Sequence, residues 1–128
     1  MEQKWKQDLH PVLTIRLFAE EKCFGPGLAQ LLRLVEKHGS LRAAASAMGM
    51  AYSKAWTIVR RGEENLGFSL LLSTVGGRHG GGAALTEQAK GILAAYESYR
   101  AALTTYGLAL FREMFGSYLQ APEQKKDL

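Results

Sequence analysis

The chain has few of the residues that form covalent cross-links or metal sites. Its 128 residues include one cysteine, Cys23, and three histidines. A single cysteine excludes an intramolecular disulfide and points to the reducing cytosol as the compartment. The histidines, His10, His38 and His79, are scattered without the spacing of metal ligands. We therefore expect no metal and no cofactor.

The sequence also lacks an export signal and a long hydrophobic run. The N-terminus has two lysines but continues into acids and a proline, where a secretory signal needs an apolar segment. The longest apolar region, residues 102–111, is too short to span a bilayer and is flanked by Arg100 and Arg112. We expect a soluble, cytoplasmic protein without a membrane partner.

Acidic residues are absent from the stretch 40–62, although the chain contains 12 of them. The same stretch carries four cations, Arg42, Lys54, Arg60 and Arg61. The formal net charge of the whole chain is only +4. The local excess of positive charge favours a polyanionic partner more strongly than the net charge does.

What the sequence does contain is a clear order of helices and strands. A length of 128 residues with 47% apolar residues is ample for one domain with its own core. Apolar spacing and turn residues predict a strand over 12–18, helices over 28–38, 41–48 and 50–66, a hairpin with strands at 68–75 and 83–86, and a long helix over 86–119. This order indicates a mainly α fold with a small β-hairpin. We place the first domain at 1–85, and the long helix with its polar tail at 86–128.

Helix ends are marked by residues that favour caps. Ser40 is placed to cap the N-terminus of the short alanine-rich helix, while Gly39 and Gly67 each follow a helix as a C-terminal stop. On the helix over 50–66, an apolar stripe is predicted to face inward and to leave the basic residues on the other faces. The residues of the stripe are Ala55, Val59, Gly62 and Leu66, with Ile58 beside them.

A glycine-rich loop covers residues 76–82, where five of seven residues are glycine and the others are Arg78 and His79. Such a loop could cradle a nucleotide phosphate, form the tip of a β-hairpin or link two domains. The P-loop pattern fails, because Gly82 stands where that pattern needs lysine, and G-x-G-x-x-G fails as well. A linker is disfavoured because strand-like residues precede the loop and a capped helix follows closely. We predict a hairpin tip, and no motif predicts an enzyme.

Two helices joined through Gly49 and Met50, a small-residue helix followed by a basic one, predict a helix-turn-helix with the hairpin as its wing. The run "GSLRAAASAMGMAYSKAWTIVRRGEENLGFSLL", followed by "GGRHGGGAALTEQAKGILAAY", resembles the N-terminal DNA-binding domain of the molybdate-responsive ModE transcription regulators, which is related to the LysR-type winged helix. The resemblance covers roughly residues 13–110. Its most specific parts are "AYSKAW" and the "GGxxGGGAxLT" hairpin.

The resemblance implies a transcriptional regulator that binds double-stranded DNA as a homodimer on a pseudo-palindromic operator. The candidate contacts on the recognition helix are Tyr52, Ser53, Lys54, Trp56, Thr57, Arg60 and Arg61. Those on the preceding helix and the wing are Ser40, Arg42, Arg78 and His79. On the long helix, apolar residues in steps of four and three predict a dimer seam. The residues of the seam are Ile92, Tyr96, Tyr99, Leu103, Tyr106 and Leu110.

Three points stay open in the sequence. Trp56 either covers the first helix of the motif or faces DNA. Full-length members of the resembled family carry C-terminal molybdate-binding modules, for which this chain leaves no room, so we expect no oxyanion sensing by it and regard a separate sensor protein as a candidate partner. The alternative function is a winged-helix module that binds another protein without contacting DNA, since Glu63 and Glu64 lie close to the basic residues.

Overall fold

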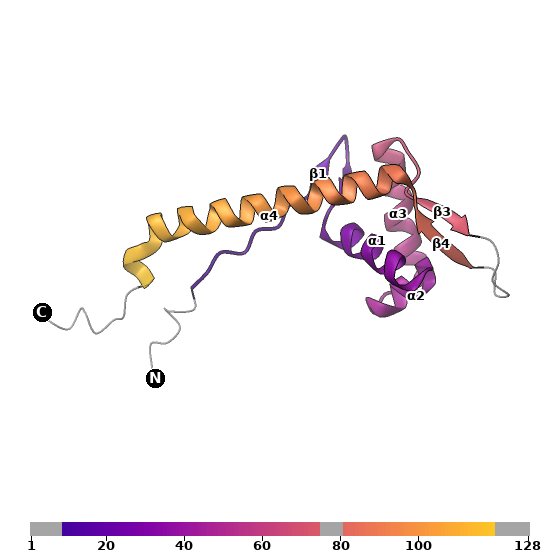
Figure 1. Cartoon of the computed structure of the whole chain (residues 1–128), viewed down its shortest axis with the longest axis horizontal. Coiled ribbons are helices and arrows are strands. Elements are labelled where there is room, and N and C mark those ends of the chain that lie inside the picture. The colour runs from indigo at the N-terminus through magenta and orange to yellow at the C-terminus, as the bar shows by residue number, and fades with distance from the viewer. Residues whose placement is uncertain (1–8, 75–80, 120–128) are drawn as a thin grey trace, which may run out of the picture. The chain divides into compact units, whose positions relative to one another are not determined.

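A computed structural model describes residues 9–74 and 81–119 of the chain. The elements are β1 (Leu17–Phe18), β2 (Lys22–Phe24), α1 (Pro26–His38), α2 (Leu41–Ala47), α3 (Tyr52–Leu66), β3 (Leu71–Thr74), β4 (Gly82–Leu85), α4 (Glu87–Phe115) and the 3-10 helix η2 (Gly116–Leu119) (Figure 1). They fall into two units, one formed by Thr14–Glu97 and the other by the described parts of Met1–Leu13 and Ser98–Leu128. The predicted mainly α, winged helix-turn-helix fold is confirmed.

The three helices α1, α2 and α3 begin and end where local chemistry favours it. Ser40 caps α2, since its Oγ accepts a hydrogen bond from the backbone N–H of Ala43 at 3.0 Å. Gly39 ends α1 and Gly67 ends α3, both with the positive φ angles that glycine adopts without strain, 84° and 89°. Each of these predicted boundaries is confirmed.

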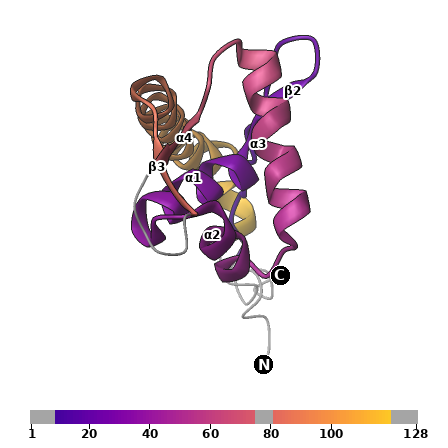
Figure 2. The same ribbon diagram turned by 90° about the vertical axis from the view of Figure 1, so that its right-hand side faces the viewer.

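The core of the unit Thr14–Glu97 lies between these three helices, the wing strands and the first turns of α4 (Figure 2). Gly62 shows how closely α3 approaches its neighbours. A Cβ atom at this position would lie 2.8 Å from Cδ2 of Leu28 and 3.2 Å from the carbonyl oxygen of Cys23. Only glycine leaves room for that contact, so Gly62 helps to determine how α3 packs on α1. The largest fully buried side chains are Phe24, Leu31, Leu32, Val35, Leu70 and Leu93.

The wing is an antiparallel pair in which Leu71 lies opposite Leu85 and Thr74 lies opposite Gly82. Its base is held by hydrogen bonds on both sides. The N–H of Ala83 donates to the carbonyl oxygen of Gly39 at 2.8 Å, and the N–H of Leu70 donates to Oε2 of Glu63 at 2.8 Å. These bonds connect the wing to the end of α1 and to α3. The tip of the wing, residues 75–80, lies outside the described residues.

Helix α4 begins next to the wing, and about its first three turns belong to the unit Thr14–Glu97. Thr86 caps it, since its Oγ1 accepts the N–H of Ala89 at 3.0 Å. Leu93 and Tyr96 are buried in the core. The hydroxyl of Tyr96 donates to the carbonyl oxygen of Ile15 at 2.8 Å, and its ring packs on Phe24 with 5.0 Å between the centroids. This part of α4 is therefore a structural element of the winged helix-turn-helix.

The N-terminal strand predicted over 12–18 is wrong for most of its length. Only Leu17–Phe18 forms a strand, and it pairs with β2, which the sequence pattern did not predict. No described residue pairs with 12–16, and Val12 is 80% exposed. Alternating apolar residues fit a strand only where a partner strand supplies hydrogen bonds, and the partner here is three residues long.

In the other unit, residues 98–115 continue α4 without a break, so Gly107 does not interrupt the helix. A Cβ atom at Gly107 would lie 3.2 Å from Cδ1 of Leu13, so the glycine allows the N-terminal segment to approach the helix closely. Phe111, Phe115 and Tyr118 form an aromatic group at the end of the helix. Within 9–74 and 81–119, no helix has both the length and the apolar character needed to cross a membrane.

Candidate nucleic-acid interface

The helix-turn-helix consists of α2, a short turn and α3. Ala44 and Ala45 on α2 and Ala55 on α3 are completely or almost completely buried, and their small side chains let the two helices pack closely. The turn contains Gly49 with a φ of 71°, and the N–H of Met50 donates to the carbonyl oxygen of Ala45 at 3.0 Å. The backbone between the helices is thus held in one conformation, which gives α3 a defined orientation relative to α2.

Helix α3 has one buried face and one exposed face, as its apolar stripe predicts. Ala55, Val59 and Gly62 are buried, whereas Ile58 and Leu66 are half-buried. The exposed side chains include most of the residues assigned from sequence to DNA contact, namely Tyr52, Ser53, Lys54, Trp56, Thr57, Arg60 and Arg61. Trp56 is 46% exposed and does not belong to the buried core, so the structure does not place it as a core aromatic residue.

The cations of this surface have little neutralising charge around them. Among the described residues, no carboxylate forms an ion pair with Arg42, Lys54 or Arg61. Arg60 lies 3.7 Å from Glu64, but both side chains are about half exposed or more, and such pairs contribute little and exchange readily. The surface of α2 and α3 is therefore electropositive.

Glu63 differs from Glu64, although the two are adjacent in sequence. The carboxylate of Glu63 accepts the N–H of Leu70, and the residue is only partly exposed. Its negative charge is directed to the base of the wing. The two acids close to the basic residues thus have separate roles, one in holding the wing and one on the exposed surface.

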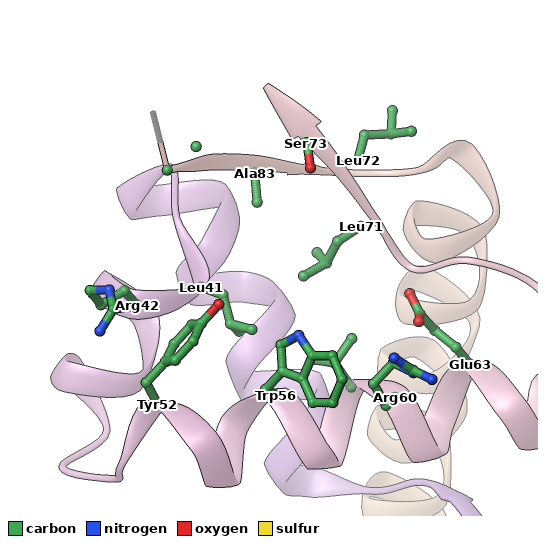
Figure 3. Close-up of a pocket in the computed structure, with 13 residues that line it drawn as sticks. Leu41, Arg42, Tyr52, Trp56, Arg60, Glu63, Leu71, Leu72, Ser73 and Ala83 are labelled. Atoms are coloured by element: carbon green, nitrogen blue, oxygen red, sulfur yellow. The ribbon is translucent and has the colours of Figure 1, made fainter. Parts of the chain in front are cut away.

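A groove of about 370 Å³ lies between α3 and the wing. Arg42, Tyr52, Trp56 and Arg60 line its helical side, and Leu72 and Ser73 of β3 line the other side (Figure 3). The guanidinium carbon of Arg42 lies 4.2 Å from the ring centroid of Tyr52, and that of Arg60 lies 4.7 Å from the ring centroid of Trp56. The sequence interpretation missed Leu72 and Ser73. The alternation of a strand tells which of its residues share a face, but it does not tell which helix lies next to that face.

Thr57 and Arg61 lie on the other flank of α3. They line a second cavity, of about 310 Å³, together with Arg16 and Lys22 near the hairpin of β1 and β2. Thr57 also donates its hydroxyl hydrogen to the carbonyl oxygen of Ser53 at 3.0 Å. Arg16 and Lys22 were not identified from sequence, because nothing in the spacing places the N-terminal segment beside α3.

The remaining assigned residues have mixed positions. Ser40 is half-buried and uses its hydroxyl oxygen to cap α2. Arg78 and His79, assigned to the wing, lie outside the described residues. In the part of the chain that the structure describes, no three His, Cys, Asp or Glu side chains come together as a metal site.

The proposed dimer seam on α4 is divided between the two units. Tyr96 is 3% exposed and Ile92 packs against the core, so both contact their own chain. Tyr99 and Tyr106 are exposed, whereas Leu103 and Leu110 are half-buried. The exposed part of the seam thus begins after Tyr96.

Comparison with known proteins gives a match over the helix-turn-helix and the wing. Residues 27–90 match the family described as "Bacterial regulatory helix-turn-helix protein, lysR family". The chain belongs to this family. Its members are DNA-binding transcription regulators, so the electropositive surface of α2 and α3 belongs to a lysR-type DNA-binding domain. The resemblance to ModE-type regulators is confirmed by the relatives.

Among these relatives is the molybdenum transport protein ModE of Azotobacter vinelandii, with 31% identity over 96 residues, which are 72% of this chain and 35% of the relative. The molybdenum-pterin-binding protein MopB of Rhodobacter capsulatus is 35% identical over 71 residues, 56% of this chain and 26% of MopB. MopA of the same organism is 32% identical over 75 residues, 59% of this chain and 28% of MopA. The chain thus spans about a quarter to a third of the length of these relatives.

Proposed function

We propose that this lysR-type chain is a sequence-specific transcriptional regulator that binds a pseudo-palindromic DNA site as a homodimer. The observation that carries the proposal is the exposed face of α3, where Lys54 and Arg61 have no carboxylate partner among the described residues and Arg60 has only an exposed one. A helix is narrow enough to enter the major groove, and unpaired cations on it lower the free energy of a complex with phosphates. Such a regulator acts in the cytoplasm and needs no catalytic residue.

The contacts divide by their position on the motif. Ser53, Lys54 and Thr57 lie on the exposed, N-terminal half of α3, which is the part that reaches base edges in helix-turn-helix proteins. We assign Arg42, near the start of α2, to contacts with the sugar-phosphate backbone, and Arg78 and His79 to the backbone or the minor groove. The base-reading and backbone-binding residues therefore come from different elements.

A dimer is supported by the part of the α4 seam that follows Tyr96. Tyr99, Leu103, Tyr106 and Leu110 recur in steps of four, three and four, which is the spacing that packs one helix along another. Exposed aromatic residues in such a row favour a partner helix. We assign the interface to these four residues and leave out Ile92 and Tyr96, which pack within their own chain. Two-fold symmetry then matches a pseudo-palindromic site.

A salt titration tests the proposal. The chain should bind a short random-sequence duplex at low ionic strength, and the logarithm of the binding constant should fall linearly with the logarithm of salt concentration, because bound phosphates release counterions. A selection from random duplexes should then enrich a two-fold symmetric sequence. Absence of binding to any duplex at low salt would contradict the proposal.

A double variant, Arg60→Ala with Arg61→Ala, tests whether the DNA interface lies on α3. Both side chains are exposed, so the unfolding temperature should stay the same while the affinity for duplex falls about tenfold or more. The matched control is Lys37→Ala with Lys90→Ala, which removes the same charge from exposed positions of α1 and α4. An equal loss in both double variants would show a general charge effect and not a site on α3.

One observation favours the alternative, a module that binds another protein. Tyr52, Trp56 and Leu72 are exposed around the groove between α3 and the wing, and exposed aromatic and apolar residues are common at protein interfaces. The same salt titration separates the two functions. A protein partner held by these side chains would bind with a weak dependence on salt, in contrast to the steep dependence expected for DNA.

A further inference from the structure

The groove between α3 and the wing contains two arginine–aromatic stacks. Arg42 on α2 lies over Tyr52, and Arg60 lies over Trp56, four residues further along α3 (Figure 3). We propose that Tyr52 and Trp56 are positioning residues, which hold Arg42 and Arg60 for contact with the phosphates of one DNA strand in this groove. The inference rests on the proposed function, which it deepens by separating phosphate contacts from base contacts.

The contact with Tyr52 leaves the N–H donors of Arg42 free. A guanidinium that lies on an aromatic ring is attracted through its face, while its N–H donors remain in the plane of the group. These donors form the fork that binds a phosphate through two parallel hydrogen bonds. Among the described residues, no hydrogen bond to another side chain occupies the donors of Arg42. The stack therefore orients Arg42 without using the atoms that a phosphate needs.

Order before binding is the physical advantage of such a stack. A free arginine loses much rotamer entropy when it is held in one geometry, and this loss opposes association. A ring at 4.2 or 4.7 Å from the guanidinium restricts the side chain before DNA arrives. Part of the side-chain entropy is then lost when the chain folds, so less is lost when DNA binds.

The charges around the groove favour an anionic occupant, such as a phosphate, over a neutral one. Among the described residues, two cations line the groove, and its one acid, Glu63, accepts a hydrogen bond from the N–H of Leu70 at the base of the wing. Glu64, the other acid near Arg60, is 3.7 Å away and exposed, so a phosphate can replace it. The opposite wall combines the small residues Ser73, Gly82 and Ala83 with Leu71 and Leu72.

The proposal gives Tyr52 and Trp56 a role that differs from base recognition. If they act only through the arginines, their replacement weakens binding equally on every sequence, because phosphates are the same at every base pair. If they read bases or stack on them, the loss depends on the sequence. The base-reading role then belongs to side chains on the exposed face between the groove and the second cavity, such as Ser53 and Lys54.

A double-mutant cycle at the Trp56 stack tests the inference. Binding is measured to a random-sequence duplex and to a selected site, at several salt concentrations. We expect Arg60→Gln to reduce the salt slope by about 0.9, the value for one phosphate contact. Trp56→Leu should weaken binding about two- to fivefold, as expected for loss of an exposed cation–π pair, and Trp56→Phe should restore most of it. In the Arg60→Gln background, Trp56→Leu should have no further effect.

The second stack provides an independent cycle, which keeps the test valid if a Trp56 variant fails to fold. Arg42→Gln should reduce the salt slope in the same way, and Tyr52→Leu should weaken binding only while Arg42 is present. Tyr52→Phe keeps the ring and should bind like the parent chain.

Three outcomes have different meanings. If the parent chain binds no duplex, the proposed function itself fails. If it binds, but the Arg42 and Arg60 variants keep the parent salt slope, the groove holds no phosphate and the inference is overturned while DNA binding stands. The inference is also overturned if Trp56→Leu loses the same affinity with and without Arg60, or loses it on the selected site alone, since Trp56 would then contact DNA directly.

Discussion

The two halves of α4 carry the same spacing of apolar residues, yet their surroundings differ. In the first half, Leu93 is 1% exposed and Tyr96 is 3% exposed, and both pack in the core around α1 and the wing. In the second half no described residue is buried, and Tyr99 and Tyr106 are 53% and 66% exposed. A periodic apolar pattern therefore tells which face of a helix is covered, but not whether the cover is the same chain or another one.

The difference also assigns separate tasks to one helix. The first half contributes to the stability of the helix-turn-helix and determines where α4 leaves it. In the second half, Tyr99 and Tyr106 are exposed, and we propose that they contact a second copy of the chain. Variants in the two halves should therefore alter different properties, one the free energy of unfolding and the other the state of association.

The largest effect is expected in the first half. Leu93→Ala should lower the free energy of unfolding by about 2–5 kcal/mol, because it removes a buried side chain and leaves a cavity. Tyr106→Ala should change it by less than about 0.5 kcal/mol at a protein concentration low enough to keep the chain monomeric. Urea unfolding of the two variants measures both values. Similar losses in the two variants would remove the distinction between the halves.

The next largest effect is expected on dimerisation, in the double variant Tyr99→Glu with Tyr106→Glu. Two carboxylates in the proposed seam oppose its desolvation, so sedimentation should show a monomer in place of a dimer. Affinity for a two-fold site should fall about a hundredfold, because the second half-site is no longer bound intramolecularly. Tyr99→Phe with Tyr106→Phe is the control and should remain dimeric. If the unmodified chain sediments as a monomer, the proposed dimer seam is contradicted.

A smaller effect is expected when one tyrosine hydroxyl is removed. Tyr96→Phe should reduce stability by about 0.5–1.5 kcal/mol, because the carbonyl of Ile15 loses its hydrogen bond. Tyr99→Phe, the control in the second half, should have no measurable effect on unfolding. Sedimentation of both variants should match the parent, and a change of association state in Tyr96→Phe would place Tyr96 in the interface after all.

The smallest effect is expected at the ion pair that joins α1 to the first half of α4. Arg33 binds Glu97 through two nitrogens and also contacts Glu36 at 2.7 Å, and these carboxylates raise the pKa of Arg33. Arg33→Gln should reduce stability by at most about 1 kcal/mol, because the side chain is half exposed. High salt should reduce this loss of stability. Arg100→Gln, the control, should not change the free energy of unfolding at low or high salt.

Much of the fold was predictable because its signals are local. Ser40, Gly39 and Gly67 define helix ends through their own backbone preferences and side-chain hydrogen bonds. The buried face of α3 follows from the spacing of Ala55 and Val59. Such features depend on residues within a few positions of each other, so the sequence alone contains the information.

The errors and gaps concern contacts between distant residues. The strand over 12–16 is absent because no partner strand is close to it, and the short strand β2 was missed for the converse reason. The two cavities beside α3 bring together side chains from the N-terminal segment, two helices and the wing. The stacks of Arg42 on Tyr52 and Arg60 on Trp56 could be proposed only once rotamers were known.

The sequence by itself determined the helix-turn-helix and its wing, since caps, turn glycines and apolar periodicity act over short distances along the chain. It also determined the electropositive character of α2 and α3, which follows from composition. Only the tertiary structure decided that Trp56 is exposed, that Glu63 is used at the base of the wing and that Tyr96 lies in the core. The physical reason is that burial and hydrogen bonding depend on which distant surfaces meet, and periodicity identifies a face without naming what covers it.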